Sequence, residues 1–250
     1  MKCLVINVAA ATRRMEAMTA QLGRLGLSFM RIDAFTPATI TDAEAGYDWD
    51  SWERPLKDTE RACFLSHVAA WQQVARQSEP MLILEDDAVL AMKTADILTK
   101  LRQLDEPEHV SLEVRMRKKI VARQGVPLGY NHKLLRLYQD RTGAAAYVLW
   151  PSGARKLLAR AKFQVALADA LICKSYDMKS YQIEPACAVQ LDRTRAYRII
   201  TNVETTSMIV AGATGVSEKL EFQFRLRRLR AQLRMALRAL RCLWVGERRF

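Results

Sequence analysis

The sequence has no stretch of 18 apolar residues free of charge, so no segment is predicted to span a bilayer. Its 10 glycines and 7 prolines are scattered, and it has no repeat or low-complexity segment, which argues against a linker between domains. The five cysteines are far apart and odd in number, which excludes a disulfide framework and fits a reducing compartment. Three histidines form no metal cluster. These absences predict a protein that is soluble or peripheral to a membrane.

Charge is unevenly distributed along the chain. There are 39 Lys and Arg against 27 Asp and Glu, a net charge of +12. Residues 217–250 hold ten of the basic and three of the acidic side chains, so they carry most of the excess. A length of 250 residues fits one α/β domain of moderate size plus an appendage. We therefore predict one domain over residues 1–216 and a basic tail over residues 217–250.

The first 34 residues read as a strand, a helix and a second strand. The apolar run at 2–8 is short and soon followed by Arg13 and Arg14, so we expect a strand there and not a secretory signal. Residues 12–25 have helical spacing and end before Gly26, and residues 27–34 resume a strand pattern. This βαβ opening predicts an α/β fold with a Rossmann-type, mostly parallel central sheet.

The alternation continues downstream. Helices are predicted at residues 58–77, 94–104 and 153–161, and strands at 81–84, 110–115, 134–138, 181–190 and in a segment ending at Trp150. Residues 167–176 surround Asp169, with a helix at 170–176 if that residue is a cap. The basic segment around Lys118 and Lys119 is expected to connect two strands. The polar stretch at 36–54 predicts an irregular surface excursion.

Three consecutive carboxylates, Glu85, Asp86 and Asp87, follow the buried strand at 81–84. In open α/β sheets ligands gather at the carboxyl ends of such strands, and adjacent like charges favour a divalent cation, Mg²⁺ or Mn²⁺. Glu85 and Asp87 face the same way in an extended chain and Asp86 faces oppositely, so Asp87 is the predicted direct ligand. The alternative is a polar loop that caps the next helix.

Further motifs surround this triplet in a fixed order. They are Ile6-Asn7 with Arg13-Arg14, residues 60–71, residues 82–87, residues 143–147 with 153–157, Ala168-Asp169-Ala170-Leu171, and residues 184–190. Together they resemble the bacterial family 25 glycosyltransferases that build lipooligosaccharide, over roughly residues 1–190. The resemblance implies a nucleotide-binding domain of the GT-A type.

The resemblance also implies an activity. It is the transfer of a hexose, with galactose from UDP-galactose leading, to a lipooligosaccharide or lipopolysaccharide core acceptor. Asp169 is then the candidate base of an inverting, metal-assisted reaction; its alternative is a cap of the helix that follows.

Four further residues are assigned to donor binding. Asn7 and Arg13 flank the loop after the first strand, which opens at the same sheet edge as the triplet, although a solvated arginine is an equal reading of Arg13. Ser66 and His67 lie in the second helix and are assigned to support of the donor pocket. A buried, purely structural histidine is the alternative for His67.

The tail predicts an amphipathic helix. One narrow face carries Phe222, Leu226, Leu229, Leu233, Leu237, Leu240 and Trp244, and one flank carries Arg227, Arg230, Arg234, Arg238 and Arg241. This pattern favours an anionic membrane surface. Because the resemblance implies a lipid-linked glycan acceptor, we expect the protein on the cytoplasmic face of a bacterial inner membrane. A helix packed on the domain or in an oligomer is the alternative.

Two other functions fit parts of the sequence. A basic nucleic-acid-binding module would account for the arginines, but the acidic triplet argues against it for the main domain, so no specific nucleic acid is expected. A metal-dependent nucleotidyltransferase or phosphohydrolase would use a similar sheet.

Overall fold

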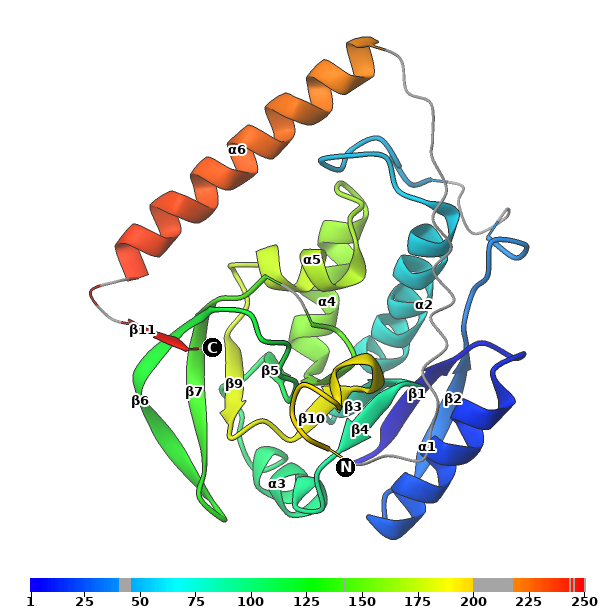
Figure 1. Cartoon of the computed structure of the whole chain (residues 1–250), viewed down its shortest axis with the longest axis vertical. Coiled ribbons are helices and arrows are strands. Elements are labelled where there is room, and N and C mark those ends of the chain that lie inside the picture. Colours follow the sequence, from blue (N-terminus) through cyan, green and yellow to red (C-terminus); the bar gives the residue numbers. More distant parts are fainter. Residues whose placement is uncertain (41–45, 142, 200–217, 243, 245, 250) are drawn as a thin grey trace.

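A nine-stranded sheet forms the centre of the protein (Figure 1). The structure, a computed structural model, describes residues 1–40, 46–141, 143–199, 218–242, 244 and 246–249. Along the sheet the strands are β11 (Gly246–Arg249), β6 (Lys119–Gly129), β7 (His132–Gln139), β9 (Ser180–Glu184), β5 (His109–Ser111), β8 (Ala146–Leu149), β3 (Met81–Glu85), β1 (Cys3–Asn7) and β2 (Phe29–Asp33). A second, two-stranded sheet pairs β4 (Ala88–Leu90) with β10 (Ala188–Gln190).

Helices cover both faces of the sheet. The helices are α1 (Thr12–Arg24), α2 (Asp58–Ala75), α3 (Thr94–Leu101), α4 (Pro151–Ala161), α5 (Ala168–Lys174) and α6 (Glu218–Cys242). Successive residues of a strand point to opposite faces, so Leu4 of β1 packs into the core under α2, α4 and α5, while Val5 packs into the core under α1 and α3. The fold is therefore an α/β architecture of three layers, and the strands buried on both faces explain the continuous apolar runs.

The expectation of a mostly parallel sheet is wrong. Only β1–β2, β1–β3 and β5–β9 pair in parallel, and the other five neighbouring pairs are antiparallel. β8 lies antiparallel between β3 and β5, and β6 and β7 form a hairpin that turns at Tyr130 and Asn131, both with positive φ. The βαβ opening predicted the parallel direction of β1 and β2 correctly. It did not predict the direction of the later strands, because their order in the sheet depends on contacts between residues far apart in sequence.

Two strands also depart from the predicted boundaries. β6 begins at Lys119, inside the segment expected to be a connection. It was not predicted because most of its residues after the first three are not buried, and because Gly125 and Pro127 are residues that usually interrupt a strand. The predicted strand at 181–190 is two strands, β9 and β10, separated at the cis peptide bond between Glu184 and Pro185.

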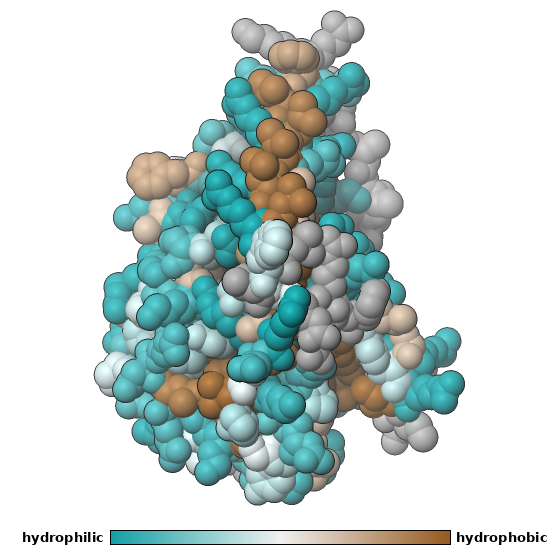
Figure 2. Space-filling view, turned by 90° about the vertical axis from the view of Figure 1, so that its left-hand side faces the viewer, coloured by the Kyte–Doolittle hydropathy of each residue, from teal (hydrophilic) through white to brown (hydrophobic). Residues whose placement is uncertain are grey.

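Helix α6 packs on the domain with one side and exposes an apolar stripe on the other (Figure 2). Phe224 and Cys242 are buried, and Arg238 donates a hydrogen bond to the Tyr138 carbonyl of β7 at 2.7 Å. The stripe consists of six side chains that are 37–69% exposed: Phe222, Leu226, Leu229, Leu233, Leu237 and Leu240. At about 100° per residue the stripe lies opposite the packed side. Among the described residues, no helix has the length and apolar character needed to cross a membrane.

The chain does not end with this helix. After α6, residues Gly246–Arg249 return to the main sheet as β11 and pair antiparallel with β6. The tail is thus a helix followed by an edge strand, which the helical pattern did not predict. The predicted boundary between residues 216 and 217 lies outside the described residues.

Candidate active site

Strand direction gathers acidic residues from separate segments at one edge of the sheet. β8 runs antiparallel to β3 and β5, so its beginning lies beside the ends of both. The backbone of Ala145, just before β8, contacts both neighbouring segments. Its carbonyl accepts a hydrogen bond from the Glu85 N–H at 2.9 Å, and its N–H donates to Glu113 Oε2 at 2.8 Å. β1 is parallel to β3 and ends here with Asn7. This is the edge at which α/β sheets bind ligands.

Glu85 is held by a chain of hydrogen bonds that begins in α2. Trp71 Nε1 donates to Tyr147 Oη at 2.8 Å, Tyr147 Oη lies 2.9 Å from His67 Nδ1, and His67 Nε2 lies 3.1 Å from Glu85 Oε1. Because an indole N–H only donates, the Tyr147 proton is free to donate to Nδ1, which leaves the ring proton on Nε2. In this network His67 donates a hydrogen bond that orients the Glu85 carboxylate, and we do not assign it as a base.

Gln190, the last residue of β10, lies between Glu85 and Asp87. Its Nε2 donates to Glu85 Oε2 at 3.0 Å and lies 3.4 Å from Asp87 Oδ2. Contact with one amide brings the two carboxylates to the same side, as expected, but Asp86 and Asp87 form a turn between β3 and β4 and not the extended chain on which that expectation rested. Burial raises the pKa of Asp87 to about 7, with further contributions from the negative charges of Glu85 and Asp86.

Asp86 turns toward the loop between β1 and α1. Arg14 Nη1 lies 3.1 Å from Asp86 Oδ1, and Asn7 Nδ2 donates to Asp86 Oδ2 at 2.6 Å. Burial raises the pKa of Asp86, and Arg14 and Asn7 oppose that rise. The charge of Asp86 is paired with Arg14, so Asp86 holds the loop between β1 and α1 in place. Asn7, which was predicted to bind the sugar donor, uses its side-chain amide for a hydrogen bond to Asp86.

Asp169 lies in the first turn of α5, one residue past the start, whereas the N-cap is Leu167. Its Oδ1 accepts from the Ala170 N–H at 2.6 Å. Burial raises the pKa of Asp169, the charge of Glu85 adds to the rise, and a backbone hydrogen bond with Gly143 opposes it. Asp169 is therefore within electrostatic range of the acidic strand end. A carboxylate with a raised pKa is a better proton acceptor near neutral pH.

Two residues assigned to donor binding lie apart from this network. Arg13 is exposed on α1, and its neighbour Arg14 is the arginine that reaches the acidic strand end. Ser66 Oγ accepts from the Phe35 N–H at 2.9 Å and donates to the Ala62 carbonyl at 2.7 Å, so it ties α2 to the loop after β2. A role of Arg13 or Ser66 in donor binding stays a prediction.

The structure adds three residues that the sequence analysis missed: Glu113, Gln190 and Tyr147. Glu113 had a usable signal, since it is a lone carboxylate in the apolar run Val110–Val114 and a buried charge is costly unless it has a function or a partner. Tyr147 and Gln190 lie within the motifs at 143–147 and 184–190, but a tyrosine within a strand and an amide at a strand end are ordinary, so nothing local assigned them a role. Their contacts depend on residues 76 to 105 positions away.

Oxygen ligands for a hard divalent cation are available from Glu85 and Asp87, which share a contact with Gln190, whereas the Glu113 carboxylate contacts the Ala145 N–H. The partners of Glu85 and Asp87 named here, His67 and Gln190, are neutral. Such a pair of under-neutralised carboxylates fits Mg²⁺ or Mn²⁺.

Cys63 provides a different potential ligand set with His67 and Glu85, whose ligand atoms lie within 4.8 Å of one another. A thiol and an imidazole suit a softer ion such as Zn²⁺. His67 Nε2 is already directed at Glu85. We therefore place the candidate site for a hard cation on the carboxylates.

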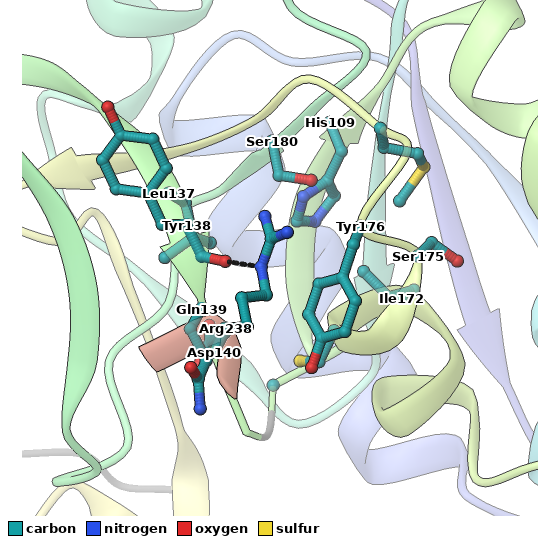
Figure 3. A pocket seen from close by; sticks show the side chains of 13 residues that line it. His109, Leu137, Tyr138, Gln139, Asp140, Ile172, Ser175, Tyr176, Ser180 and Arg238 are labelled. Carbon is teal, nitrogen blue, oxygen red and sulfur yellow. Dashed lines mark hydrogen bonds between the residues drawn. The ribbon is translucent and has the colours of Figure 1, made fainter. Parts of the chain in front are cut away.

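A cavity between β7, α5 and α6 is too small for a substrate (Figure 3). Its volume is about 20 Å³, which is enough for one water molecule. His109 lines it with both ring nitrogens unpaired among the described residues, and burial lowers the pKa of His109 to about 3. Arg238 reaches into it from α6, with its guanidinium carbon 4.2 Å from the centre of the Tyr176 ring. The cavity thus marks the contact between α6 and the domain.

A comparison with protein families identifies the class of this protein. Residues 1–172 match the model described as Glycosyltransferase family 25 (LPS biosynthesis protein), and the chain belongs to this family of glycosyltransferases.

Individual relatives are more distant. The lipooligosaccharide biosynthesis protein lic2B of Haemophilus influenzae is 24% identical over 203 residues, which cover 74% of each chain. The lacto-N-neotetraose biosynthesis glycosyltransferase LgtE of Neisseria meningitidis serogroup B is 25% identical over 206 residues, 74% of this chain and 72% of that protein. A solved glycosyltransferase involved in glycosylation of the major capsid of PBCV-1 has a TM-score of 0.35 at 12% identity, covering 79% of this chain and 96% of that one.

Proposed function

We propose that this glycosyltransferase moves a hexose from a UDP-sugar to a lipooligosaccharide or lipopolysaccharide core, with inversion and with help from a divalent metal ion. The observation that carries the proposal is the pair Glu85 and Asp87, which share the amide of Gln190 within electrostatic range of Asp169. The printed names of the relatives, which concern lipooligosaccharide and lacto-N-neotetraose biosynthesis, support the acceptor class. The family resemblance supports galactose as the sugar.

Two sets of residues serve the two sides of the reaction: Glu85 and Asp87 act on the leaving diphosphate, and Asp169 acts on the attacking hydroxyl. Glu85 and Asp87 would hold Mn²⁺ or Mg²⁺, which when bound neutralises charge on the leaving diphosphate. Asp169 accepts the proton of the acceptor hydroxyl as its oxygen bonds to the anomeric carbon. The bond from that carbon to the diphosphate oxygen breaks in the same displacement, so an α-linked donor gives a β-linked product. His67 and Tyr147 keep Glu85 oriented.

The tail supports a membrane location for this reaction. The exposed leucine stripe of α6 faces away from the domain, and Arg230, Arg234 and Arg241 border it. An apolar stripe next to arginines complements an anionic bilayer, in which apolar side chains enter the interface and guanidinium groups pair with headgroups. We therefore place the protein at the cytoplasmic face of the inner membrane, where a lipid-linked acceptor is accessible.

A donor panel tests the activity. The full chain is incubated with several UDP-sugars, with Mn²⁺ or a chelator, and with or without a truncated lipooligosaccharide, and the release of UDP is measured. We expect release from UDP-galactose that needs both Mn²⁺ and acceptor. Release from no donor would overturn the transferase proposal. Hydrolysis of nucleotides without any sugar acceptor, at full rate, would instead favour the phosphohydrolase alternative.

A further inference from the structure

Three side chains of different chemistry converge at the acidic edge: Cys63, His67 and Glu85. One potential ligand atom from each lies within 4.8 Å of the other two. Cys63 and His67 are four residues apart in α2, so they lie on the same face of that helix. Glu85 is the last residue of β3. A helix and a strand thus bring a thiol, an imidazole and a carboxylate to one place.

The cluster is open to solvent on the side of Cys63. Cys63 is exposed, Glu85 is half-buried and His67 is fully buried. Although part of the Cys63 side chain is accessible, desolvation by surrounding atoms raises the pKa of its thiol, and the charges of Glu85, Asp169 and Asp87 raise it further. The thiol therefore lies within electrostatic range of the candidate site, and an ion can reach it from the solvent.

Neighbouring side chains hold the other polar atoms of His67 and Glu85. His67 Nδ1 lies 2.9 Å from Tyr147 Oη, and Glu85 Oε2 accepts from Gln190 Nε2 at 3.0 Å. An ion on His67 Nε2 requires the ring proton on Nδ1, and Tyr147 Oη can accept that hydrogen bond, because a hydroxyl oxygen accepts as well as donates. Imidazoles that bind metals usually have such a partner for their second nitrogen.

The spacing of the three groups suits a tetrahedral ion. Bonds of ~2.0–2.3 Å from zinc to nitrogen, oxygen and sulfur place neighbouring ligand atoms about 3.3–3.8 Å apart. His67 Nε2 and Glu85 Oε1 are 3.1 Å apart, which is close to this range. The Cys63 sulfur would have to move by roughly 1 Å at most. Because Cys63 is exposed, rotation about χ1 can supply that movement.

The ligand types favour a zinc-like ion over Mn²⁺. A thiolate and an imidazole suit Zn²⁺, whereas Mn²⁺ prefers oxygen ligands. Binding releases the thiol proton to solvent, and the resulting thiolate and the carboxylate together balance the two positive charges of the ion. Three protein ligands leave the fourth tetrahedral position to water.

We propose that Cys63, His67 and Glu85 form a second cation site, which takes Zn²⁺ and thereby inhibits the transferase. The site itself does not depend on the proposed function, but inhibition does, because Glu85 is also a proposed ligand for Mn²⁺ or Mg²⁺. Zinc withdraws this carboxylate from the other ion, and repulsion between two divalent cations adds to the effect. Each ion therefore weakens the binding of the other.

Spectroscopy of the full chain with Co²⁺ tests the ligands directly. Co²⁺ can occupy zinc sites, and a thiolate bound to it gives a charge-transfer band in the near ultraviolet. We expect this band in wild type without donor or acceptor, and we expect Zn²⁺ to abolish it. Cys63→Ser should lack the band and should lose Zn²⁺ affinity by at least about 100-fold, since altering a group that merely supports a metal ligand already costs 10- to 100-fold.

Further variants separate the two sites by calorimetry in a phosphine-reduced buffer. Cys63→Ser should weaken only Zn²⁺ binding, Asp87→Asn mainly Mn²⁺ binding, and Glu85→Gln both. Cys173→Ser in α5 is the matched control and should bind Zn²⁺ as wild type does. Thermal unfolding of each metal-free variant checks its fold, and Cys63→Ala repeats the test if Cys63→Ser is unstable.

Inhibition is measured as UDP release at a fixed Mn²⁺ concentration, with each variant compared with its own rate without Zn²⁺. We expect Cys63→Ser to need about 100-fold more Zn²⁺ for half inhibition, in proportion to its loss of affinity. Calorimetry with Mn²⁺ should also show weaker Mn²⁺ binding in wild type saturated with Zn²⁺.

The outcomes separate the two proposals. Absence of the Co²⁺ band in wild type, or wild-type Zn²⁺ affinity in a folded Cys63 variant, would overturn the zinc site and leave the transferase proposal intact. Zinc bound through Cys63 with unchanged UDP release would overturn the inhibition. No UDP release from any donor would overturn the proposed function and the inhibition with it, whereas the Co²⁺ band and the Zn²⁺ affinities would still decide the zinc site.

Discussion

The acidic edge of the sheet and helix α6 place opposite kinds of group in an unfavourable environment. At the edge, carboxylates lie partly or wholly buried beside neutral amide, imidazole and backbone groups. On α6, large apolar side chains are exposed to water, and arginines lie beside them. Both arrangements are costly in the isolated chain. The comparison teaches that the chain has two surfaces of opposite character, one acidic and partly buried, and one apolar, bordered by arginines and exposed, and the proposed function assigns a cation to the first and a membrane to the second.

The largest expected effect is at Asp169. Asp169→Asn removes the proposed proton acceptor, so turnover should fall by about 10²- to 10⁴-fold, the usual contribution of a general base. Donor binding should stay near wild type, because the change lies on the acceptor side. Turnover is measured as UDP release, and donor affinity by calorimetry. Full turnover in this variant would show that the base lies elsewhere.

Neighbouring carboxylates should behave differently. Asp87→Asn removes a proposed ion ligand and should weaken Mn²⁺-dependent donor binding by about 10- to 100-fold or more. Asp86→Asn loses the ion pair with Arg14 and should lower thermal stability more than donor affinity. Calorimetry with UDP-galactose, with and without Mn²⁺, measures the first effect and thermal unfolding the second. Equal losses of donor affinity in both variants would contradict the division of roles.

The α6 side of the comparison predicts a moderate effect. Replacing Leu229 and Leu233 with Asn should reduce binding to phosphatidylglycerol vesicles by about tenfold. Both leucines are already partly covered, and an interface removes only part of the rest from water, so each contributes well under the ~1.5–3 kcal/mol of full burial. Co-sedimentation of the full chain measures this. The matched control replaces Met92 and Val126, exposed apolar residues outside α6, and should bind normally.

Lipid composition and DNA separate the alternatives for α6. Binding to phosphatidylcholine vesicles should be much weaker, because the arginines gain less from neutral headgroups. If the leucine variant binds anionic vesicles as well as wild type does, the stripe is not a membrane surface. Salt-sensitive binding to DNA that exceeds binding to anionic vesicles would favour the nucleic-acid alternative.

The smallest expected effect concerns pH. Burial raises the pKa of both Asp87 and Glu113 to about 7, so between about pH 4 and pH 7 the folded state binds more protons than the unfolded state. These groups therefore stabilise the metal-free fold at low pH and lose that contribution as pH rises through about 7. Metal-free Glu113→Gln should accordingly lose less stability than wild type between pH 5 and pH 8 in thermal unfolding. Saturating Mn²⁺ should reduce the wild-type loss, and an identical pH slope in both proteins would contradict this account.

Local patterns predicted much of the first half of the fold. β1, α1, β2, α2 and β3 lie where apolar periodicity placed them, within a few residues at their ends. Periodicity does not report which strands are neighbours, so the antiparallel position of β8 was not predictable. β6 was missed for a local reason, since most of its length is exposed and therefore lacks a buried pattern.

The candidate site was predictable in the same uneven way. Glu85 and Asp87 do lie on one side and Asp86 on the other, as expected, but a turn at Asp86–Asp87 produces this arrangement, and not the two-residue period of a strand. Local spacing was not enough to choose between Arg13 and Arg14, because that depends on how α1 is rotated against the sheet. Glu113 required knowledge of the strand order, which brings the end of β5 beside the beginning of β8.

The return of the chain as β11 has a practical consequence for α6. β11 covers the backbone hydrogen-bonding groups of β6, which would otherwise be an open sheet edge able to pair with other chains. Deleting the tail would therefore remove the helix with the exposed leucine stripe and create an aggregation-prone edge at once. Lost activity in such a truncated protein would be uninterpretable, and the contribution of α6 has to be measured with single-residue changes in an intact chain.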